Sequence, residues 1–304
     1  TYDANNATGG TVPASNSAAT GSTFTVTTNS GTLVRTGYTF GGWNSAANGS
    51  GTTYAAGTGT FTLNSDITLY ALWTPNTFTV TYDGNTSTGG SIPTDSSSPY
   101  NYGSTVTVRS NSGSLVKTNY TFVGWNTLAN GSGTDYLPSS TFTLGAANVV
   151  LYAKWIQTCT STLDTTALPG YALIKFTTVG KCAWTNDTGK TVLDMALVGG
   201  GGSAGYGNRG AGGGAGQVVI SNSGIAVAAN AVLIITVGDG GASVGTTSGP
   251  GNNGTASTIY LGSTLLVSAL GGGGGGGAIA TRNGLNGGSG GGGIGDVSGG
   301  ASSG

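Results

Sequence analysis

Short alternations of apolar and threonine-rich polar positions run through the first half of the chain. Residues 24–27, 61–63 and 78–82 each place apolar side chains on one face and threonines on the other, which is the period of a β-strand. Turn dipeptides such as Asn48-Gly49 separate these segments. No window carries apolar residues at helical spacing beyond a single possible turn at 32–35. The pattern therefore predicts an all-β fold.

The second half alternates apolar strands with glycine tracts. We expect strands at residues 171–176, 191–198, 216–221, 231–237 and 258–270. Glycine-rich stretches lie between and after them, at residues 205–216, 237–254, 271–277 and 284–300. Because ordering glycine costs roughly 0.5–1 kcal/mol more per residue than alanine, such tracts either stay mobile or pack as only glycine allows. We predict a β-sandwich with the tracts gathered at one end as ordered, partly polyproline-II-like loops.

Long segments of the first half occur twice. Tyr38–Asn44 (YTFGGWN) returns as Tyr120–Asn126 (YTFVGWN), and the motif that ends in Trp73 returns at Trp155. Such repetition indicates tandem modules, which we place at residues 1–75 and 76–156, followed by a third domain at 157–304. The segment before the second TYD motif, residues 77–80, has no counterpart before Thr1. We expect a truncated first strand and further repeats upstream in a longer parent chain.

Each module resembles the Listeria–Bacteroides repeat, also called the internalin B-repeat. The shared elements are the TYD strand, the GG and P positions, Y-T-F-x-G-W-N, and the closing T-L-Y-A-x-W, with Val123 in place of the first glycine of the GGW triplet. The resemblance covers residues 1–156. It implies a small β-grasp-like module of exported bacterial surface proteins, used in tandem between an anchor and a distal domain.

Composition excludes several functions. Only 6% of the residues are charged, against roughly 25% in ordinary soluble domains, and the net charge is −1. Such a surface has no strong field to attract nucleic acid or anionic lipid, and no apolar run is long enough to span a membrane. Histidine is absent, and all acidic residues are Asp. We expect no enzyme, no cofactor, no metal, no nucleic-acid partner and no direct membrane insertion.

Cys159 and Cys182 are the two cysteines of the chain. Their spacing is not that of a redox or zinc motif, which a cytosolic protein would require. In an exported protein they would form a disulfide, which would stabilise the fold by roughly 3–4 kcal/mol. We predict the bridge, with free thiols as the alternative.

The recurring tryptophans have two interpretations. Trp43, Trp73, Trp125 and Trp155 could present platforms for sugar rings together with Tyr54 and Tyr136. They could equally form the cores of modules of about 80 residues, since one aromatic side chain buries roughly 150–250 Å². We favour the four tryptophans as structural core.

The second half, from about residue 171, resembles the glycine-rich C-terminal domains of bacterial surface proteins and phage tail adhesins. The resemblance lies in strands that end in LVGGGG, ITVGDGG and ALGGGGGGG. In that class the glycine-rich tip is implicated in receptor or surface contact. By this resemblance the contact residues would be Tyr206, Arg209, Arg282 and Asn283.

Three motifs that suggest other chemistry are set aside. Gly205–Gly210 fits GxGxxG, but more glycine follows where a dinucleotide site needs a helix. Gly292–Asp296 resembles a calcium-binding glycine repeat, but its spacing is one residue short. Lys175 and Asp194 could lie on adjacent strands and support an intramolecular amide bond, which we do not favour.

We therefore predict a non-enzymatic protein of the cell exterior, located at the cell surface. The repeats would form a stalk and residues 157–304 an adhesive or assembly head. Its partners would be other copies of itself or a cell-surface receptor or glycan. Alternatives are a subunit of an extracellular fibre or sheath, and a module that binds ice or polysaccharide.

Overall fold

The computed structural model describes residues 1–207, 210–245, 249–277, 283–293 and 301. Within these ranges all regular secondary structure is β-strand, so the predicted all-β class is confirmed. The same residues include no helix with the length and hydrophobicity of a membrane span.

The chain divides into two compact units. The first comprises Thr1–Asn85, Ser91–Gly113 and Trp125–Tyr152, and the second comprises Thr86–Gly90, Ser114–Gly124 and Ala153–Gly304. The predicted limits at 75/76 and 156/157 follow the sequence repeat instead. We keep them to name the first repeat (1–75), the second repeat (76–156) and the C-terminal part (157–304).

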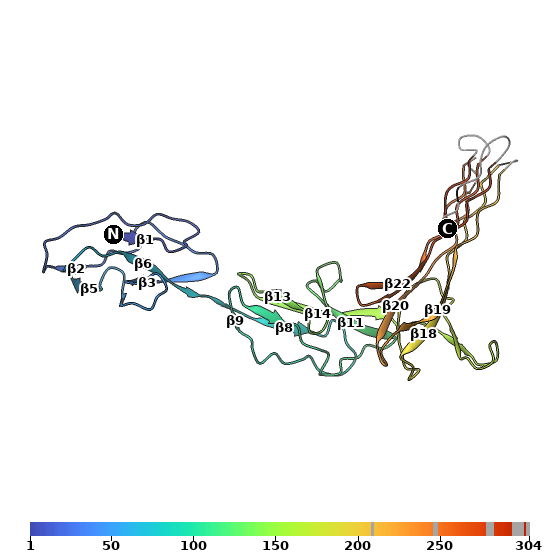
Figure 1. Ribbon diagram of the computed structural model, residues 1–304, viewed down its shortest axis with the longest axis horizontal. Coiled ribbons are helices and arrows are strands. Elements are labelled where there is room, and N and C mark those ends of the chain that lie inside the picture. Colours follow the sequence, from blue (N-terminus) through green and yellow to red (C-terminus); the bar gives the residue numbers. More distant parts are fainter. Residues whose placement is uncertain (208–209, 246–248, 278–282, 294–300, 302–304) are drawn as a thin grey trace. The chain divides into compact units, whose positions relative to one another are not determined.

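The first repeat forms a four-stranded mixed sheet and a separate two-stranded ribbon (Figure 1). Its strands are β1 (Tyr2–Asp3), β2 (Thr23–Thr25), β3 (Tyr38–Asn44), β4 (Thr53–Tyr54), β5 (Thr60–Thr62) and β6 (Leu69–Pro75). The sheet has the order β1-β6-β3-β4, in which β1 and β6 run parallel and the other pairs run antiparallel. β2 and β5 form the ribbon, with Phe24 opposite Phe61.

The second repeat builds the same sheet from the matching residues. Its strands are β7 (Thr77–Phe78), β8 (Val80–Asp83), β9 (Tyr100–Asn101), β10 (Thr105–Thr107), β11 (Tyr120–Asn126), β12 (Asp135–Tyr136), β13 (Thr141–Thr143) and β14 (Val149–Gln157). The order β12-β11-β14-β8 again contains one parallel pair, β8 with β14. β10 pairs with β13, and β7 pairs with β9.

One tryptophan sits at the centre of each repeat. Trp43 and Trp125 are both 0% exposed and pack against Tyr2 and Tyr82, with ring centroids 4.5 and 4.7 Å apart. These two residues form the core as expected. Trp73 and Trp155 are only half-buried and contact Phe40 and Phe122 edge-on, because their strand positions lie at the margin of the core.

The GGW triplet shows why only one of its glycines is invariant between the repeats. Gly42 and Gly124 have φ of +116° and +139°, a backbone conformation that residues with a Cβ atom rarely adopt. A Cβ on Gly42 would also lie 2.6 Å from the carbonyl oxygen of Tyr54. At Gly41 the nearest atom to such a Cβ is 3.5 Å away, so Val123 fits at the equivalent position of the second repeat.

The C-terminal part contains two sheets around a shared apolar core, as the sandwich prediction required. Its strands are β15 (Thr162–Asp164), β16 (Leu173–Lys175), β17 (Gly180–Thr185), β18 (Val192–Val198), β19 (Val218–Ala226), β20 (Val232–Val237), β21 (Ser257–Leu261) and β22 (Thr264–Ala269). The sheet β17-β20-β21-β22 faces the pair β18-β19, and β15 pairs with β16. The core consists of Met195, Leu197, Val227, Leu233, Ile235, Val267 and Ala269.

This part differs from the sequence prediction in several details, and β15 is one element that was not predicted. The single strand expected at 258–270 is a hairpin, β21-β22, because Gly262 takes a positive φ of 59° and turns the chain. β17 was not predicted, since Lys181 and Thr185 interrupt its apolar run, yet it pairs with β20 over its whole length.

Cys159 and Cys182 are joined by a disulfide, as predicted. Cys159 lies two residues beyond β14, and Cys182 lies in β17. The amide of Cys159 also donates to the carbonyl of Ala183 at 2.8 Å. The disulfide thus ties the chain that leaves the second repeat to the first long strand of the C-terminal part.

Candidate functional site: a bundle of glycine tracts

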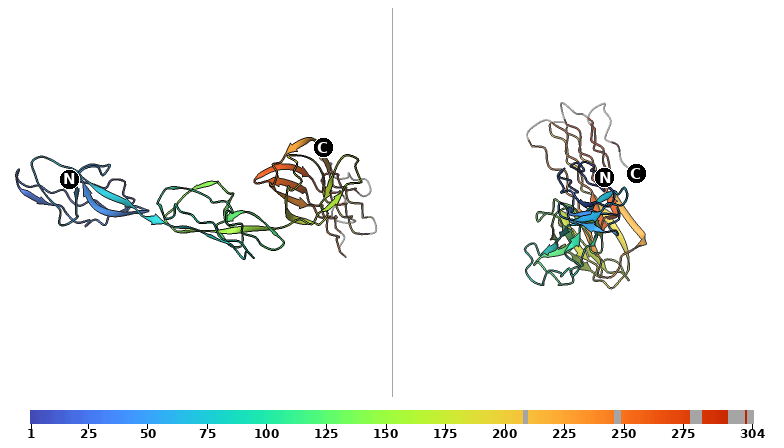
Figure 2. Two further views of the ribbon diagram at one scale, coloured as in Figure 1. Left: turned by 90° about the horizontal axis from the view of Figure 1, so that it is seen from below. Right: turned by 90° about the vertical axis from the view of Figure 1, so that its left-hand side faces the viewer.

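Glycine-rich stretches of the C-terminal part run side by side and form a bundle (Figures 1 and 2). We name them by their residues: tract A (199–206), tract B (210–217), tract C (238–242), tract D (249–255), tract E (270–277) and tract F (284–292). Tracts A to E each follow or precede a strand of the sandwich, so the core holds one end of each.

Tract A shows how the bundle is held together. Every third amide donates to a tract B carbonyl at 2.8–2.9 Å: Gly199 to Gln217, Gly202 to Gly214 and Gly205 to Ala211. The amide of the residue that follows each of these donates to a tract D carbonyl at 2.9–3.0 Å: Gly200 to Thr255, Ser203 to Asn252 and Tyr206 to Gly249. A period of three residues is that of the polyproline-II helix, so the predicted conformation is confirmed.

Tract E lies at the centre, with residues 272–277 buried. It donates to tract A from Gly272 and Gly275, and to tract F from Gly273 and Gly276, at 2.8–2.9 Å. Tracts B and D in turn donate to tract E carbonyls from Ala211, Gly214, Gly251 and Gly254. Further bonds run from tract C to tract A, from tract D to tract C and from tract F to tract B. The whole pattern corresponds to two stacked layers of three tracts: C, A and B in one layer, and D, E and F in the other.

Steric contacts explain why these positions are glycine. A Cβ on Gly202 would lie 2.1 Å from the carbonyl oxygen of Gly273, and one on Gly275 would lie 2.0 Å from that of Ala211. Side chains cannot be accommodated at such distances. Each ordered glycine costs roughly 0.5–1 kcal/mol more than alanine, and the backbone hydrogen bonds between tracts offset part of that cost.

At some tract positions, no close contact within the described bundle requires glycine. Within the described ranges, a Cβ on Gly212 would meet no atom within 4 Å, and one on Gly201 would lie 3.7 Å from its nearest neighbour. Both residues are exposed. They line outer surfaces on which backbone, rather than side chains, meets the solvent.

The predicted contact residues fall in two groups. Tyr206 at the end of tract A and Asn283 beside tract F are both exposed, so each is available to a partner. Arg209 and Arg282 lie outside the described residues.

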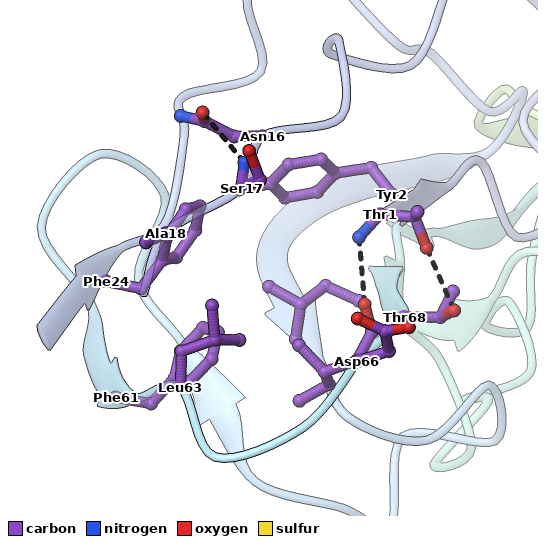
Figure 3. A pocket seen from close by; sticks show the side chains of 12 residues that line it. Thr1, Tyr2, Asn16, Ser17, Ala18, Phe24, Phe61, Leu63, Asp66 and Thr68 are labelled. Carbon is purple, nitrogen blue, oxygen red and sulfur yellow. Dashed lines mark hydrogen bonds between the residues drawn. The ribbon is translucent and has the colours of Figure 1, made fainter. Parts of the chain in front are cut away.

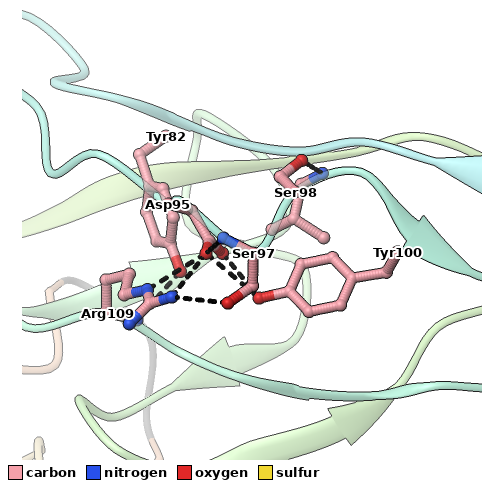
Figure 4. A network of polar contacts seen from close by, with 7 residues as sticks. Tyr82, Asp95, Ser97, Ser98, Tyr100 and Arg109 are labelled. Atoms are coloured by element: carbon pink, nitrogen blue, oxygen red, sulfur yellow. Dashed lines mark hydrogen bonds and ion pairs between the residues drawn. The ribbon is translucent and has the colours of Figure 1, made fainter.

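A network of charged and polar side chains lies in the second repeat (Figure 4). Arg109 forms an ion pair with Asp95 at 2.6 Å, and the hydroxyl of Tyr100 donates to the same carboxylate at 2.9 Å. Burial of Asp95 favours its neutral form, but the hydrogen bonds from Arg109, Tyr100 and the Ser97 amide outweigh it and lower the pKa of Asp95. The carboxylate is 2% exposed. It is a structural anion rather than a proton acceptor.

Sequence reasoning missed this network, although a signal was present. The first repeat has Ser15 two residues after its proline where the second has Asp95, and Thr27 where the second has Arg109. Thr27 and Arg109 are equivalent because each accepts the indole N–H of its repeat's buried tryptophan. Paired substitution of two uncharged residues by opposite charges would have identified the contact.

The first repeat contains a hollow of about 420 Å³ (Figure 3). It is lined by Thr1, Tyr2, Asn16, Ser17, Ala18, Phe24, Phe61, Leu63, Asp66, Ile67, Thr68 and Leu69. In the second repeat the residue equivalent to Ala18 is Tyr100, which pairs with Phe78 of β7. The hollow thus corresponds to a place that a strand occupies in the other repeat, and nothing in its lining points to a small ligand.

The remaining motifs contribute no site. Lys175 pairs with Asp164 at 2.9 Å, and β16 and β18 belong to different sheets, so the possible bond partner Asp194 is not its neighbour. Residues 205 and 210 belong to tracts A and B, and no helix follows them. Asp296 lies outside the described residues. Elsewhere in the described chain, no group of acidic or cysteine residues could hold a metal ion.

Comparison with known families identifies both halves. Residues 1–72 and 78–154 match the Listeria–Bacteroides repeat domain, and residues 177–304 match a family described as a glycine-rich domain. No solved structure matches the chain.

Two curated relatives come from Evansella cellulosilytica. One, named "Putative Gly-rich membrane protein", is 41% identical over 159 residues, which is 51% of this chain and 18% of the relative. The other, named "Putative membrane protein", is 38% identical over 96 residues, which is 32% of this chain and 14% of the relative. The chain therefore covers less than a fifth of either relative.

Proposed function

Since the chain contains two tandem Listeria–Bacteroides repeat domains followed by a glycine-rich domain, we propose that it is a non-enzymatic display module of the cell exterior. In this role the repeats act as a spacer, and the bundle of tracts A to F is the contact head. The head binds a receptor or glycan on a cell surface.

The ordered bundle is the observation that carries this proposal. Its tracts are held by backbone hydrogen bonds at three-residue intervals, and side chains are excluded from its interior. What it offers to a partner is a surface of fixed shape with isolated side chains such as Tyr206 and Asn283. Fixed shape lowers the conformational entropy that binding would otherwise cost.

The titratable groups support a role without catalysis. The ion pairs with Arg109 and Lys175 lower the pKa of Asp95 and of Asp164, so both carboxylates are held in the charged form. A general acid or base needs a pKa near the working pH, and these shifts go the opposite way.

The disulfide and the names of the relatives support a location outside the cytosol. Disulfides such as Cys159–Cys182 persist in oxidising compartments. The relatives are named as membrane proteins, which is compatible with attachment to a cell surface through parts of a longer chain.

The test is binding of the purified chain to intact cells and to a glycan array. Replacing Tyr206 by Ala should weaken binding at least threefold, because it removes an aromatic contact on the head. Replacing Tyr171 by Ala is the matched control, since Tyr171 is 64% exposed in the same part of the chain but outside the tracts. Absence of binding to every surface, or equal loss in both variants, would contradict the proposed head.

A second role is assembly into a fibre or sheath, which is favoured by exposed tract backbone at residues such as Gly212. Light scattering at rising protein concentration separates this role from adhesion. Retention on cellulose or chitin and thermal hysteresis measurements address the ice- or polysaccharide-binding alternative.

A further inference from the structure

One side of tract B has no hydrogen-bonding partner among the residues that the structure describes. The amides and carbonyls of Gly213 and Gly216 make no hydrogen bond within the described structure, and the amides of Gly212 and Ala215 are also unpaired there. Gly212, Gly213 and Ala215 are exposed. The remaining face of the tract is fully used, because Ala211, Gly214 and Gln217 donate to tract E.

These unpaired groups recur at the interval that the bundle uses internally. Gly213 and Gly216 are three residues apart, as are the tract A residues that donate to tract B. Only another polyproline-II tract repeats its donors and acceptors at that interval. A β-strand, with its period of two, would meet only alternate groups.

Gly212 also favours the approach of a second polypeptide backbone to tract B. Gly212 costs conformational entropy that an alanine would not, yet no atom of the described residues lies within 4 Å of its Cβ position. Elsewhere in the bundle, glycine occurs where a second backbone approaches closely, as at Gly275 against Ala211. A glycine at an open position therefore fits the close approach of a backbone from outside.

We infer that tract B is a self-association surface, on which tract B of a second copy docks antiparallel. The antiparallel direction follows from the bundle itself, where tract A pairs antiparallel with tract B and tract B pairs antiparallel with tract E. An antiparallel pair of identical tracts obeys a two-fold axis, which gives a closed dimer. With the axis between residues 214 and 215, Gly213 of each copy lies opposite Gly216 of the other.

This dimer goes beyond the proposed display role, and each can fail alone. A head that binds cells as a monomer would leave the display role intact and remove the dimer. A dimer without cell binding would do the reverse.

Sedimentation velocity of the full chain, from micromolar to near-millimolar concentration, tests the inference. We expect a monomer–dimer equilibrium. Gly212→Asp should weaken the dimer at least tenfold, because it places a charged side chain where the backbone near residue 217 of the second copy must approach. Gly240→Asp in tract C is the matched control, since it adds the same charge at an exposed tract position whose nearest neighbour belongs to tract A, and it should leave the dimer dissociation constant unchanged.

A second variant reports the geometry directly. Ala215→Cys should form an intermolecular disulfide under mild oxidation, because the two-fold axis brings the two copies of residue 215 together. A monomeric wild-type chain over the whole concentration range would overturn the inference. So would equal weakening by both aspartate variants, or an Ala215→Cys chain that remains monomeric after oxidation.

Discussion

The buried indole of Trp125 donates a hydrogen bond to the backbone carbonyl of Arg109 at 2.9 Å. The amide of the same Arg109 donates to the hydroxyl of Tyr82 at 2.8 Å, while its guanidinium binds Asp95. One residue thus joins the aromatic centre of the second repeat to its charged network. In the first repeat, Thr27 makes the two backbone contacts without the ion pair.

Trp125→Phe should destabilise the second repeat by about 2–4 kcal/mol. The substitution removes the indole N–H from a buried carbonyl and leaves a void where the larger ring packed. Chemical denaturation followed by near-ultraviolet circular dichroism measures the loss. Tyr120→Phe, at a side chain that is 43% exposed, should stay within about 0.5 kcal/mol of the wild type. Similar losses in both would argue against the central role of Trp125.

Asp95→Asn should lower stability by about 1–2 kcal/mol at neutral pH, a range that allows for solvent screening of the partly exposed Arg109. The folded state lowers the pKa of Asp95 below its ordinary value of 3.8, so its contribution is complete above that value. It disappears as the pH falls through the folded-state pKa. The difference between wild type and variant should therefore vanish in strong acid. A difference that stays constant with pH would show that the ion pair contributes nothing.

Gly275→Ala should disorder the tract bundle. Its methyl carbon would lie 2.0 Å from the carbonyl oxygen of Ala211, and tract E is surrounded by tracts A, B, D and F. Amide hydrogen exchange should show lost protection throughout these tracts. Gly201→Ala, with its nearest atom at 3.7 Å, should retain protection and gain up to about 0.5–1 kcal/mol through reduced unfolded-state entropy. Retained protection in Gly275→Ala would exclude the packing described.

Reduction of the Cys159–Cys182 disulfide should cost about 3 kcal/mol, as expected for a bridge with a sequence separation of 23. A Cys159→Ser, Cys182→Ser double variant should lose the same amount and become insensitive to reductant. Thermal unfolding with and without reductant checks both. An equal response of wild type and variant to reductant would mean that the bridge is absent in solution.

The repeats could be predicted in detail because their signals are local. Threonine alternation and the duplicated YTF-x-GWN motif indicate strands and modules, and the recurrence of Trp43 as Trp125 indicates a core position. The ion pair between Asp95 and Arg109 has no such local signal, since it becomes visible only when the two repeats are compared position by position.

The sequence predicted the polyproline-II conformation of the head but not the order in which its tracts pack. Glycine density indicates the polyproline-II conformation, since that is the dense packing open to chains without side chains. Which tract lies against which depends on backbone hydrogen bonds that look identical at every glycine. The central position of tract E, and the open position of Gly212, therefore appear only in three dimensions.

The helical turn of tract A constrains how such heads can change in length. Adding one residue to a tract would rotate every later carbonyl by a third of a turn and misdirect it from its neighbour. Adding three would restore the phase and simply lengthen the rod. Insertions and deletions within the tracts of related heads should therefore come in multiples of three residues.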